Sequence, residues 1–260
     1  MQYDAVILAG GENSSELKKI APYDNEALII IGNYPMIYYV YSALRATPAI
    51  SNIIVSGPVE ALRNILPRED KLFFVEGGEN AIDSFAHAVK ILEGKGLSDK
   101  VLVVPTDVPF ITSEAIEDFL TCCEASKADF YYPLTCKEVN ERKYPGVVRT
   151  YVRLKEGVFT GGNLFLVRSE LISACLEMGV KLFYRRKNPL AMARLFGVSL
   201  VWKYLLGRLS IQMAEKRFYE VVGIRGKGII SSYAEVGVDV DKPCDLQLAQ
   251  EYLGGINFSR

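Results

Sequence analysis

The chain has 260 residues, 50% of them hydrophobic and 23% charged, and a formal net charge of -1. This composition is that of a globular protein, and the length suits one large α/β domain. The near-zero charge gives no indication of nucleic-acid binding. One histidine, His87, excludes His-dependent triads and multi-histidine metal centres, and five cysteines without a CxxC spacing argue against a zinc site.

The first half of the chain alternates short apolar runs with segments of helical spacing. Continuous apolar strands that alternate with helices indicate a mostly parallel sheet covered on both faces. The predicted fold class is therefore α/β, a doubly wound three-layer sandwich with a mostly parallel central sheet. We expect strands at 3–9, 52–57, 71–78 and 99–107, and helices at 36–46 and 83–96.

The pattern changes after about residue 128. Strands are expected at 128–134, 146–154, 160–167 and 219–224, and a helix at 169–179. Residues 235–253 predict a strand, an acidic turn and a closing helix. Residues 181–218 are both basic and apolar, and predict a helical insert within one domain that spans residues 1–260.

Distinctive residues follow several of the predicted strands. These are Gly10-Gly11, Gly77-Gly78 and Asp107. In a doubly wound sheet, the ligand crevice lies beyond the carboxyl ends of the strands. A glycine loop there lets backbone N–H groups approach a phosphate. Three such features at strand ends predict a phosphate-binding crevice, although a lone glycine pair is usually just a turn.

Carboxylates near this crevice predict a Mg²⁺ site. Asp107 follows a strand and precedes Val108-Pro109, where it could hold a magnesium ion that bridges phosphate oxygens. Asp239 and Asp241 are two residues apart, so an extended chain would point both to the same side. We expect Asp107 and Asp239 to be the metal ligands and Asp241 to be a structural partner. Helix caps or turn residues are the alternative for Asp107 and Asp241.

Five stretches occur in the order found in the molybdenum-cofactor-type nucleotidyltransferases, which use the nucleotide-diphospho-sugar transferase fold. They are VILAGG, EALIIIGNYPMI, PTDVPFIT, TGGNLFLV and VDVDKPCDLQLA. The stretch GGENAIDSFAHAV also resembles the glycine–serine segment of the methylerythritol-phosphate cytidylyltransferases. The resemblance covers residues 3–125 and 158–253 in outline and leaves out most of the basic insert.

The resemblance implies a magnesium-dependent transfer of a nucleotidyl group from GTP or CTP to a phosphorylated small molecule, with release of pyrophosphate. It also implies roles for individual residues. Leu8, Ala9, Gly10 and Gly11 would hold the base and phosphates, Gly77, Gly78 and Ser84 would line the base pocket, Asp107 and Asp239 would bind Mg²⁺, and Asn163 would lie near the acceptor.

The sequence departs from this family pattern at its cations. The family's first loop carries an arginine after the glycines and a lysine before the Ala-Leu pair, where this chain has Ser14 to Glu16 and Glu26. A further arginine of the cytidylyltransferase segment is replaced by Ala81. Lys18 and Lys19 are the nearest substitutes and are the predicted catalytic cations. The insert could instead supply Arg185, Arg186 or Lys187 by folding over the crevice.

The departure keeps two other functions open. One is a non-catalytic protein that binds a nucleotide or nucleotide sugar, and the other is a glycosyltransferase-like enzyme, whose diphosphate donor needs fewer cations. For the insert, packing against the core is placed first, a lid second, and contact of residues 189–206 with a membrane surface third. No transmembrane segment and no leader is recognised, so a cytoplasmic location is expected. The sequence leaves the oligomeric state open.

Overall fold

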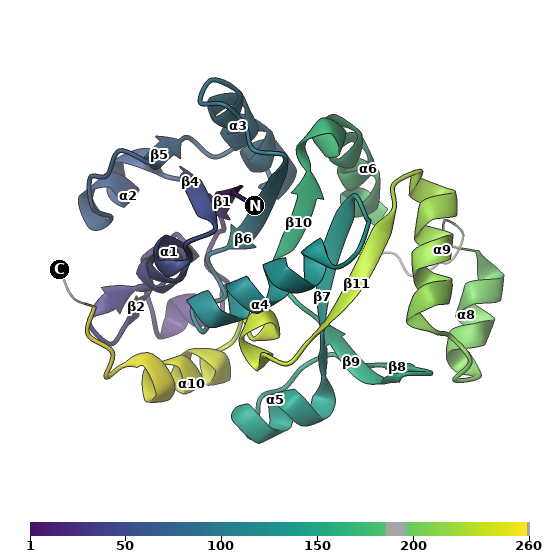
Figure 1. Cartoon of the computed structure of the whole chain (residues 1–260). Coiled ribbons are helices and arrows are strands. Elements are labelled where there is room, and N and C mark those ends of the chain that lie inside the picture. Colours follow the sequence, from purple (N-terminus) through teal and green to yellow (C-terminus); the bar gives the residue numbers. More distant parts are fainter. Residues whose placement is uncertain (186–194, 196, 259–260) are drawn as a thin grey trace.

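The computed structural model describes residues 1–185, 195 and 197–258. Its centre is a mixed sheet in which, among the described residues, nine strands follow the order β5-β4-β1-β6-β10-β7-β9-β8, with β11 paired to β7 (Figure 1). The strands are β1 (Tyr3–Leu8), β4 (Ile50–Ser56), β5 (Leu72–Val75), β6 (Lys100–Pro105), β7 (Phe130–Cys136), β8 (Val152–Leu154), β9 (Gly157–Gly161), β10 (Phe165–Arg168) and β11 (Gly226–Ser231). A separate two-stranded sheet pairs β2 (Ile30–Ile31) with β3 (Tyr34–Pro35).

The strand directions confirm the mostly parallel prediction. β5, β4, β1 and β6 are parallel neighbours, and β11 is parallel to β7. Only β10 and β9 run against the other strands of the described sheet, because β10 is antiparallel to both β6 and β7, and β9 is antiparallel to both β7 and β8. The carboxyl ends of β1, β4, β5 and β6 therefore meet at one edge.

Helices cover both faces of this sheet, as the three-layer prediction requires. They are α1 (Met36–Ala46), α2 (Val59–Ile65), α3 (Ala81–Glu93), α4 (Ser113–Glu124), α5 (Lys137–Lys143), α6 (Ile172–Arg185), α8 (Val198–Leu205), α9 (Ile211–Val222) and α10 (Pro243–Leu253). One buried cluster joins α1 and α4 to the strands, and another joins α3 and α6 to the opposite face. Phe218 of α9 stacks on Phe130, which stacks on Phe165 of that second face.

Local sequence explains the best-defined helices. Asn80 begins α3, because its side chain accepts hydrogen bonds from the Ile82 and Asp83 N–H groups. Gly94 is the C-cap of α3 and lies two residues before the end of the predicted segment 83–96. Thr112 caps α4 in the same way, accepting from the Ala115 N–H. Prolines begin or precede α1 and α10, where the fixed φ of proline suits a helix start.

Four predictions from the second half of the chain are wrong in part. Residues 219–224, predicted as a strand, lie at the end of α9 and in the turn after it, and the strand follows as β11. Residues 235–240 form a 3-10 turn (Ala234–Gly237) and irregular backbone rather than a strand. The expected strand at 160–167 divides into the end of β9 and β10, because the chain turns at Gly162-Asn163. Of 146–154 only Val152–Leu154 is extended.

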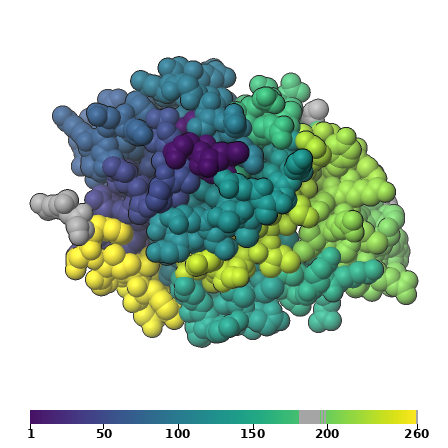
Figure 2. Space-filling model, viewed as in Figure 1, coloured from purple at the N-terminus to yellow at the C-terminus, as the bar shows by residue number. Residues whose placement is uncertain are grey.

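The described helices of the basic and apolar part, α8 and α9, lie at the far end of the sheet from the N-terminal strands (Figure 1). α8 and α9 form the flank beside β11 in both views (Figures 1 and 2). The described part of the predicted insert 181–218 is thus mainly helical: it contains the end of α6, all of α8 and the first part of α9. Among the described residues, no helix is both long and apolar enough to cross a bilayer.

Candidate nucleotide and metal site

Glycines gather where β1, β4 and β5 end. A methyl group on Gly77 would lie 3.6 Å from the Gly57 Cα and 3.6 Å from the Ser84 Oγ, and one on Gly10 would lie 3.7 Å from the same Oγ. The Ser84 hydroxyl accepts a hydrogen bond from the Gly78 N–H at 3.0 Å. The structure thus brings together Gly10, Gly77, Gly78 and Ser84, which the sequence analysis assigned to one pocket.

Gly57 belongs to the same pocket but was not singled out in the sequence. A methyl group there would lie 2.6 Å from the Ala9 carbonyl oxygen, so only glycine lets the ends of β1 and β4 approach this closely. The sequence did contain an indication of this role, because Gly57 ends the apolar run 52–57, which was predicted to be a strand. Ala9 is buried, and its carbonyl accepts from the Asn25 side chain at 2.8 Å, which ties the first loop to the strand end. Leu8 is the last residue of β1.

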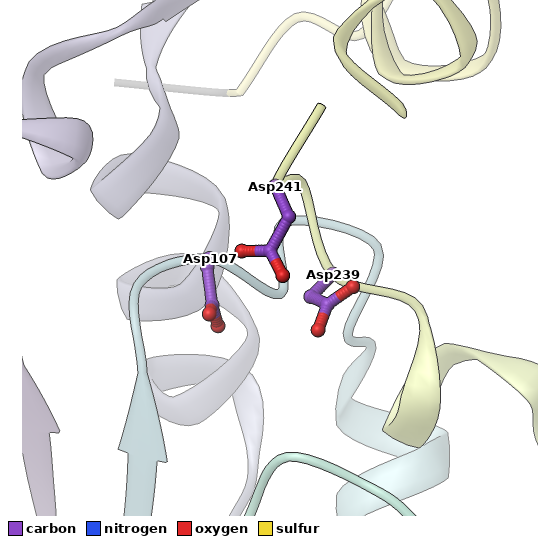
Figure 3. A group of neighbouring side chains, drawn as sticks. All are labelled: Asp107, Asp239 and Asp241. Carbon is purple, nitrogen blue, oxygen red and sulfur yellow. The ribbon is translucent and has the colours of Figure 1, made fainter. Parts of the chain in front are cut away.

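Three aspartates from two loops converge beside this pocket. Asp107 follows β6, and Asp239 and Asp241 precede α10, yet one carboxylate oxygen of each lies within 4.8 Å of the others. Figure 3 shows the three side chains facing one another across the two loops. The loops are held together by the Val240 N–H, which donates to the Asp107 carbonyl at 2.8 Å. The spacing suits a divalent cation with oxygen ligands.

Asp239 is oriented by two neighbours. Arg149 forms an ion pair with its carboxylate and donates a second hydrogen bond to its backbone carbonyl at 2.8 Å. The Asn163 Nδ2 donates to the Asp239 Oδ2 at 2.7 Å. Asn163 therefore lies beside a predicted metal ligand. Arg149 was missed in the sequence, because it falls in a run that was interpreted only as a strand and lies in irregular backbone.

Asp241 is a candidate ligand rather than a helix cap. The capping interactions of α10 are made by Asp245, whose Oδ2 accepts from the backbone N–H groups of Lys242 at 3.0 Å and Asp241 at 3.3 Å. The Asp241 carboxylate is left exposed and lies with Asp107 and Asp239. The structure thus adds Asp241 to the two ligands expected from the sequence.

Burial and neighbouring charge act together on Asp107. Its Oδ1 is buried and has no hydrogen-bond partner among the described residues. Burial, followed by the charges of Glu26 and Asp241, raises the pKa of Asp107 to about 8, against an opposing effect of Arg149. A carboxylate held this way is expensive to ionise alone and would gain from a cation at its free oxygen.

Glu26 is a fourth carboxylate at this site. It lies in the 3-10 turn Glu26–Leu28, and its carboxylate covers Gly11, since a methyl group on that glycine would overlap it. Burial, followed by the charge of Asp241, raises the pKa of Glu26 to about 7. At this position the family pattern has a lysine. The substitution therefore replaces a cation over the glycine loop with an acid.

Lys18 and Lys19 lie on the 3-10 turn Leu17–Lys19 in the loop that follows the glycines. The loop contacts the aspartate side through Ser14, whose hydroxyl donates to the Asp241 carbonyl at 3.3 Å. Both lysines are exposed, and Lys18 pairs with Asp24 at 3.1 Å. Of the alternative cations, Arg186 and Lys187 lie outside the described residues, as does the side chain of Arg185.

A polar pocket of about 230 Å³ opens next to the aspartates. Arg149, Asn163 and Lys242 line it together with Asp239 and Asp241. The Arg149 Nε is buried without a hydrogen-bond partner among the described residues. The pocket thus offers cations and an amide beside the predicted metal ligands.

Comparisons with known proteins identify the family and the fold. The family model of the MobA-like NTP transferase domain matches residues 5–194. A hypothetical transferase from Thermus thermophilus is 33% identical, with a TM-score of 0.81 over 95% of this chain and 100% of that one. Among curated proteins, none matches the sequence.

More distant structures share the fold. The 4-diphosphocytidyl-2C-methyl-D-erythritol synthase of Anaerococcus prevotii is 16% identical, with a TM-score of 0.62 over 97% of this chain and 96% of that one. The 2-C-methyl-D-erythritol 4-phosphate cytidylyltransferase of Francisella tularensis is 14% identical, with a TM-score of 0.60 over 97% and 100%. The family match covers most of the sequence, and the chain belongs to the MobA-like NTP transferase domain family.

Proposed function

We propose that the protein is a Mg²⁺-dependent nucleotidyltransferase that moves a nucleoside monophosphate from CTP or GTP to a phosphorylated small molecule. The observation that carries the proposal is the convergence of Asp107, Asp239 and Asp241 beside the glycine pocket. Membership of an NTP transferase family supports a triphosphate substrate. The cytidylyltransferases that share the fold favour CTP over GTP as the first nucleotide to test.

The residues present fit a magnesium ion. The Asp107 Oδ1 is buried and unpartnered, and Asp239 and Asp241 present further oxygens within 4.8 Å. When bound, Mg²⁺ would neutralise phosphate oxygens during the transfer. The proposed ligands are Asp107 and Asp239, as predicted from the sequence, with Asp241 as the third.

The protein's own residues would position the two substrates. In the proposed reaction, a phosphate oxygen of the acceptor forms a bond to the α-phosphorus, and the bond from that phosphorus to the bridging oxygen breaks, so pyrophosphate leaves with the electron pair. Gly10 would face the phosphates, whereas the Glu26 carboxylate covers Gly11, and Gly77 and Ser84 would border the base. Arg149 and Asn163 hydrogen-bond to Asp239 and line the polar pocket beside the aspartates, which is the proposed place of the acceptor.

The cations that would meet the departing pyrophosphate are proposed to be Lys18 and Lys19. Their turn follows the glycine loop, and Ser14 ties that loop to the aspartate side. The Lys18–Asp24 pair is exposed, so a triphosphate could exchange with Asp24 at small cost.

Pyrophosphate release tests the proposed function. The wild type is incubated with Mg²⁺, each of the four NTPs and a panel of sugar and polyol phosphates. We expect release that depends on one NTP and on an acceptor, and a loss of at least 100-fold in Asp107→Asn. Asp70→Asn is the matched control, because Asp70 is exposed on the opposite side of β4 from β1 and should leave the rate unchanged. Equal release in Asp107→Asn and the wild type would contradict the proposal.

A further inference from the structure

The end of α8 exposes three large apolar side chains. Trp202, Leu205 and Leu206 have exposed fractions of 60%, 65% and 63%. Their spacing of three and four residues places them on one face, at the last turn of the helix and its C-cap. We call these three residues the α8 surface. A soluble monomer seldom leaves such a cluster facing water without a partner.

The sequence around this surface has one sign of charge. Between Glu177 and Glu215 there are seven lysines and arginines and no acidic residue. Because the whole chain has a net charge of -1, the remainder must carry -8. Lys203 and Arg208, which flank the α8 surface, are exposed. Because the two described charges that flank the surface, Lys203 and Arg208, are both positive, its partner should be anionic.

The segment is apolar on its inner side as well. Beneath α8 and α9 lies an apolar groove of about 480 Å³, lined by Leu134, Phe159, Leu200, Leu209 and Phe218 among others. α9 has no fully buried residue. Packing against the core, the first expectation from the sequence, therefore accounts for the inner side only. The apolar residues on the outer side need another explanation.

We propose that the α8 surface binds the face of an anionic lipid bilayer. Trp202 would lie at the headgroup level, Leu205 and Leu206 would enter the acyl boundary, and Lys203 and Arg208 would meet the anionic headgroups. A second copy of the chain is a poorer occupant, because a symmetric contact would bring the Lys203 and Arg208 of the two copies together. Nucleic acid would use the cations but would gain little from two exposed leucines.

Trp202 is the chain's only tryptophan, so its emission reports on this surface directly. The full chain is titrated with vesicles of pure phosphatidylcholine and with vesicles containing 30% phosphatidylglycerol. We expect a blue shift and co-sedimentation with the anionic vesicles, at least 10-fold weaker binding to phosphatidylcholine, and weakening in high salt. Neither nucleotide nor metal is needed, so this test succeeds or fails independently of the proposed transferase activity.

Two variants and one control make the test specific. Leu205→Glu/Leu206→Glu should reduce binding at least 10-fold, and so should Lys203→Glu/Arg208→Glu. Ile20→Glu changes an apolar residue that is 57% exposed far along the chain and should bind as the wild type does. Circular dichroism checks folding of each variant, and the charge pair keeps the test valid if the leucine pair does not fold.

The proposal is overturned if the anionic vesicles leave the emission unchanged. It is equally overturned if both double variants bind as tightly as the wild type. A blue-shifted emission in lipid-free dimers would assign the surface to a second copy instead. Tight binding of a single-stranded RNA oligonucleotide, with no response to vesicles, would assign it to nucleic acid.

Discussion

At the scale of single residues, the site concentrates negative charge around a partly buried carboxyl group. Burial first, and then the charges of the neighbouring carboxylates, raise the pKa of Asp107 and of Glu26. The positive charge of Arg149 acts in the opposite direction and lowers the pKa of Asp107. Like charges gathered in this way cost stability until a cation binds, which is a common compromise at functional sites.

Asp107→Asn should therefore stabilise the metal-free protein. The pKa of Asp107 is about 8 when folded and near its ordinary value of 3.8 when unfolded, so between these values the folded state holds a proton that the unfolded state releases. The contribution of Asp107 to the free energy of unfolding of the wild type therefore falls as the pH rises from 4 to 8. The variant should melt roughly 2 to 4 °C above the wild type at pH 8, corresponding to about 1 to 2 kcal/mol, and little above it at pH 4.

Thermal unfolding in the presence of a chelator measures this difference. Added Mg²⁺ should then raise the melting temperature of the wild type and leave that of Asp107→Asn unchanged. A variant that melts below the wild type at pH 8 would show that Asp107 is held by stabilising contacts instead.

Glu26→Lys tests the substitution at the glycine loop. The Glu26 carboxylate covers Gly11, where a lysine would face the phosphates, so reversing the charge should tighten triphosphate binding by about tenfold. Calorimetric titration with the preferred NTP measures the change. Glu16→Lys adds the same charge at an exposed position of the same loop and should have little effect. Weaker binding in Glu26→Lys alone would indicate that Glu26 itself holds a cation.

At the scale of elements, the parallel half of the sheet was predictable because its strands are short and continuously apolar. The expected runs at 3–9 and 52–57 became β1 and β4, and the helix at 36–46 became α1 without a change of bounds. β11 was missed because the positions that face α9 include Gly226 and Gly228, which leave room for that helix. A methyl group on Gly226 would lie 2.7 Å from the Phe218 ring. Such close packing is visible only in three dimensions.

The ion pair of Asp129 and Arg225 joins β7 to β11. Two guanidinium nitrogens donate to the Asp129 carboxylate at 2.9 and 3.0 Å, and this pairing holds the pKa of Asp129 below its usual range. A lowered pKa contributes stability above the unfolded value, and that contribution is lost as pH falls through the folded value. Asp129→Asn should cost about 1 to 2 kcal/mol at pH 7.

Urea unfolding at pH 7 and near pH 3 checks this prediction. The difference between Asp129→Asn and the wild type should shrink at the lower pH, where the wild-type carboxylate takes up a proton. Asp118→Asn, on the surface of α4, is the control. If the difference in the free energy of unfolding between Asp129→Asn and the wild type is the same at both pH values, the ion pair does not contribute to stability.

At the scale of the whole molecule, the site joins two distant parts of the sequence: the glycine pocket and Asp107 come from the first half, and Asp239 and Asp241 precede the last helix. Strand-end positions in the first half were predictable, because the topology of parallel strands fixes where their carboxyl ends meet. The role of Arg149 was not, because it depends on how a loop 90 residues upstream of Asp239 folds back beside it. The helical flank likewise could be predicted as apolar and basic, but its exposed face depends on how α8 packs.

The central claim is that the aspartates and the glycine pocket form one magnesium-dependent site for a nucleoside triphosphate. Calorimetric titration of all four NTPs, with and without Mg²⁺, into the wild type and Asp107→Ala tests it most directly. We predict that one NTP binds only with Mg²⁺ and that Asp107→Ala abolishes this binding. Binding of nucleotide diphosphates or nucleotide sugars, with no binding of any NTP at millimolar concentration, would contradict the claim.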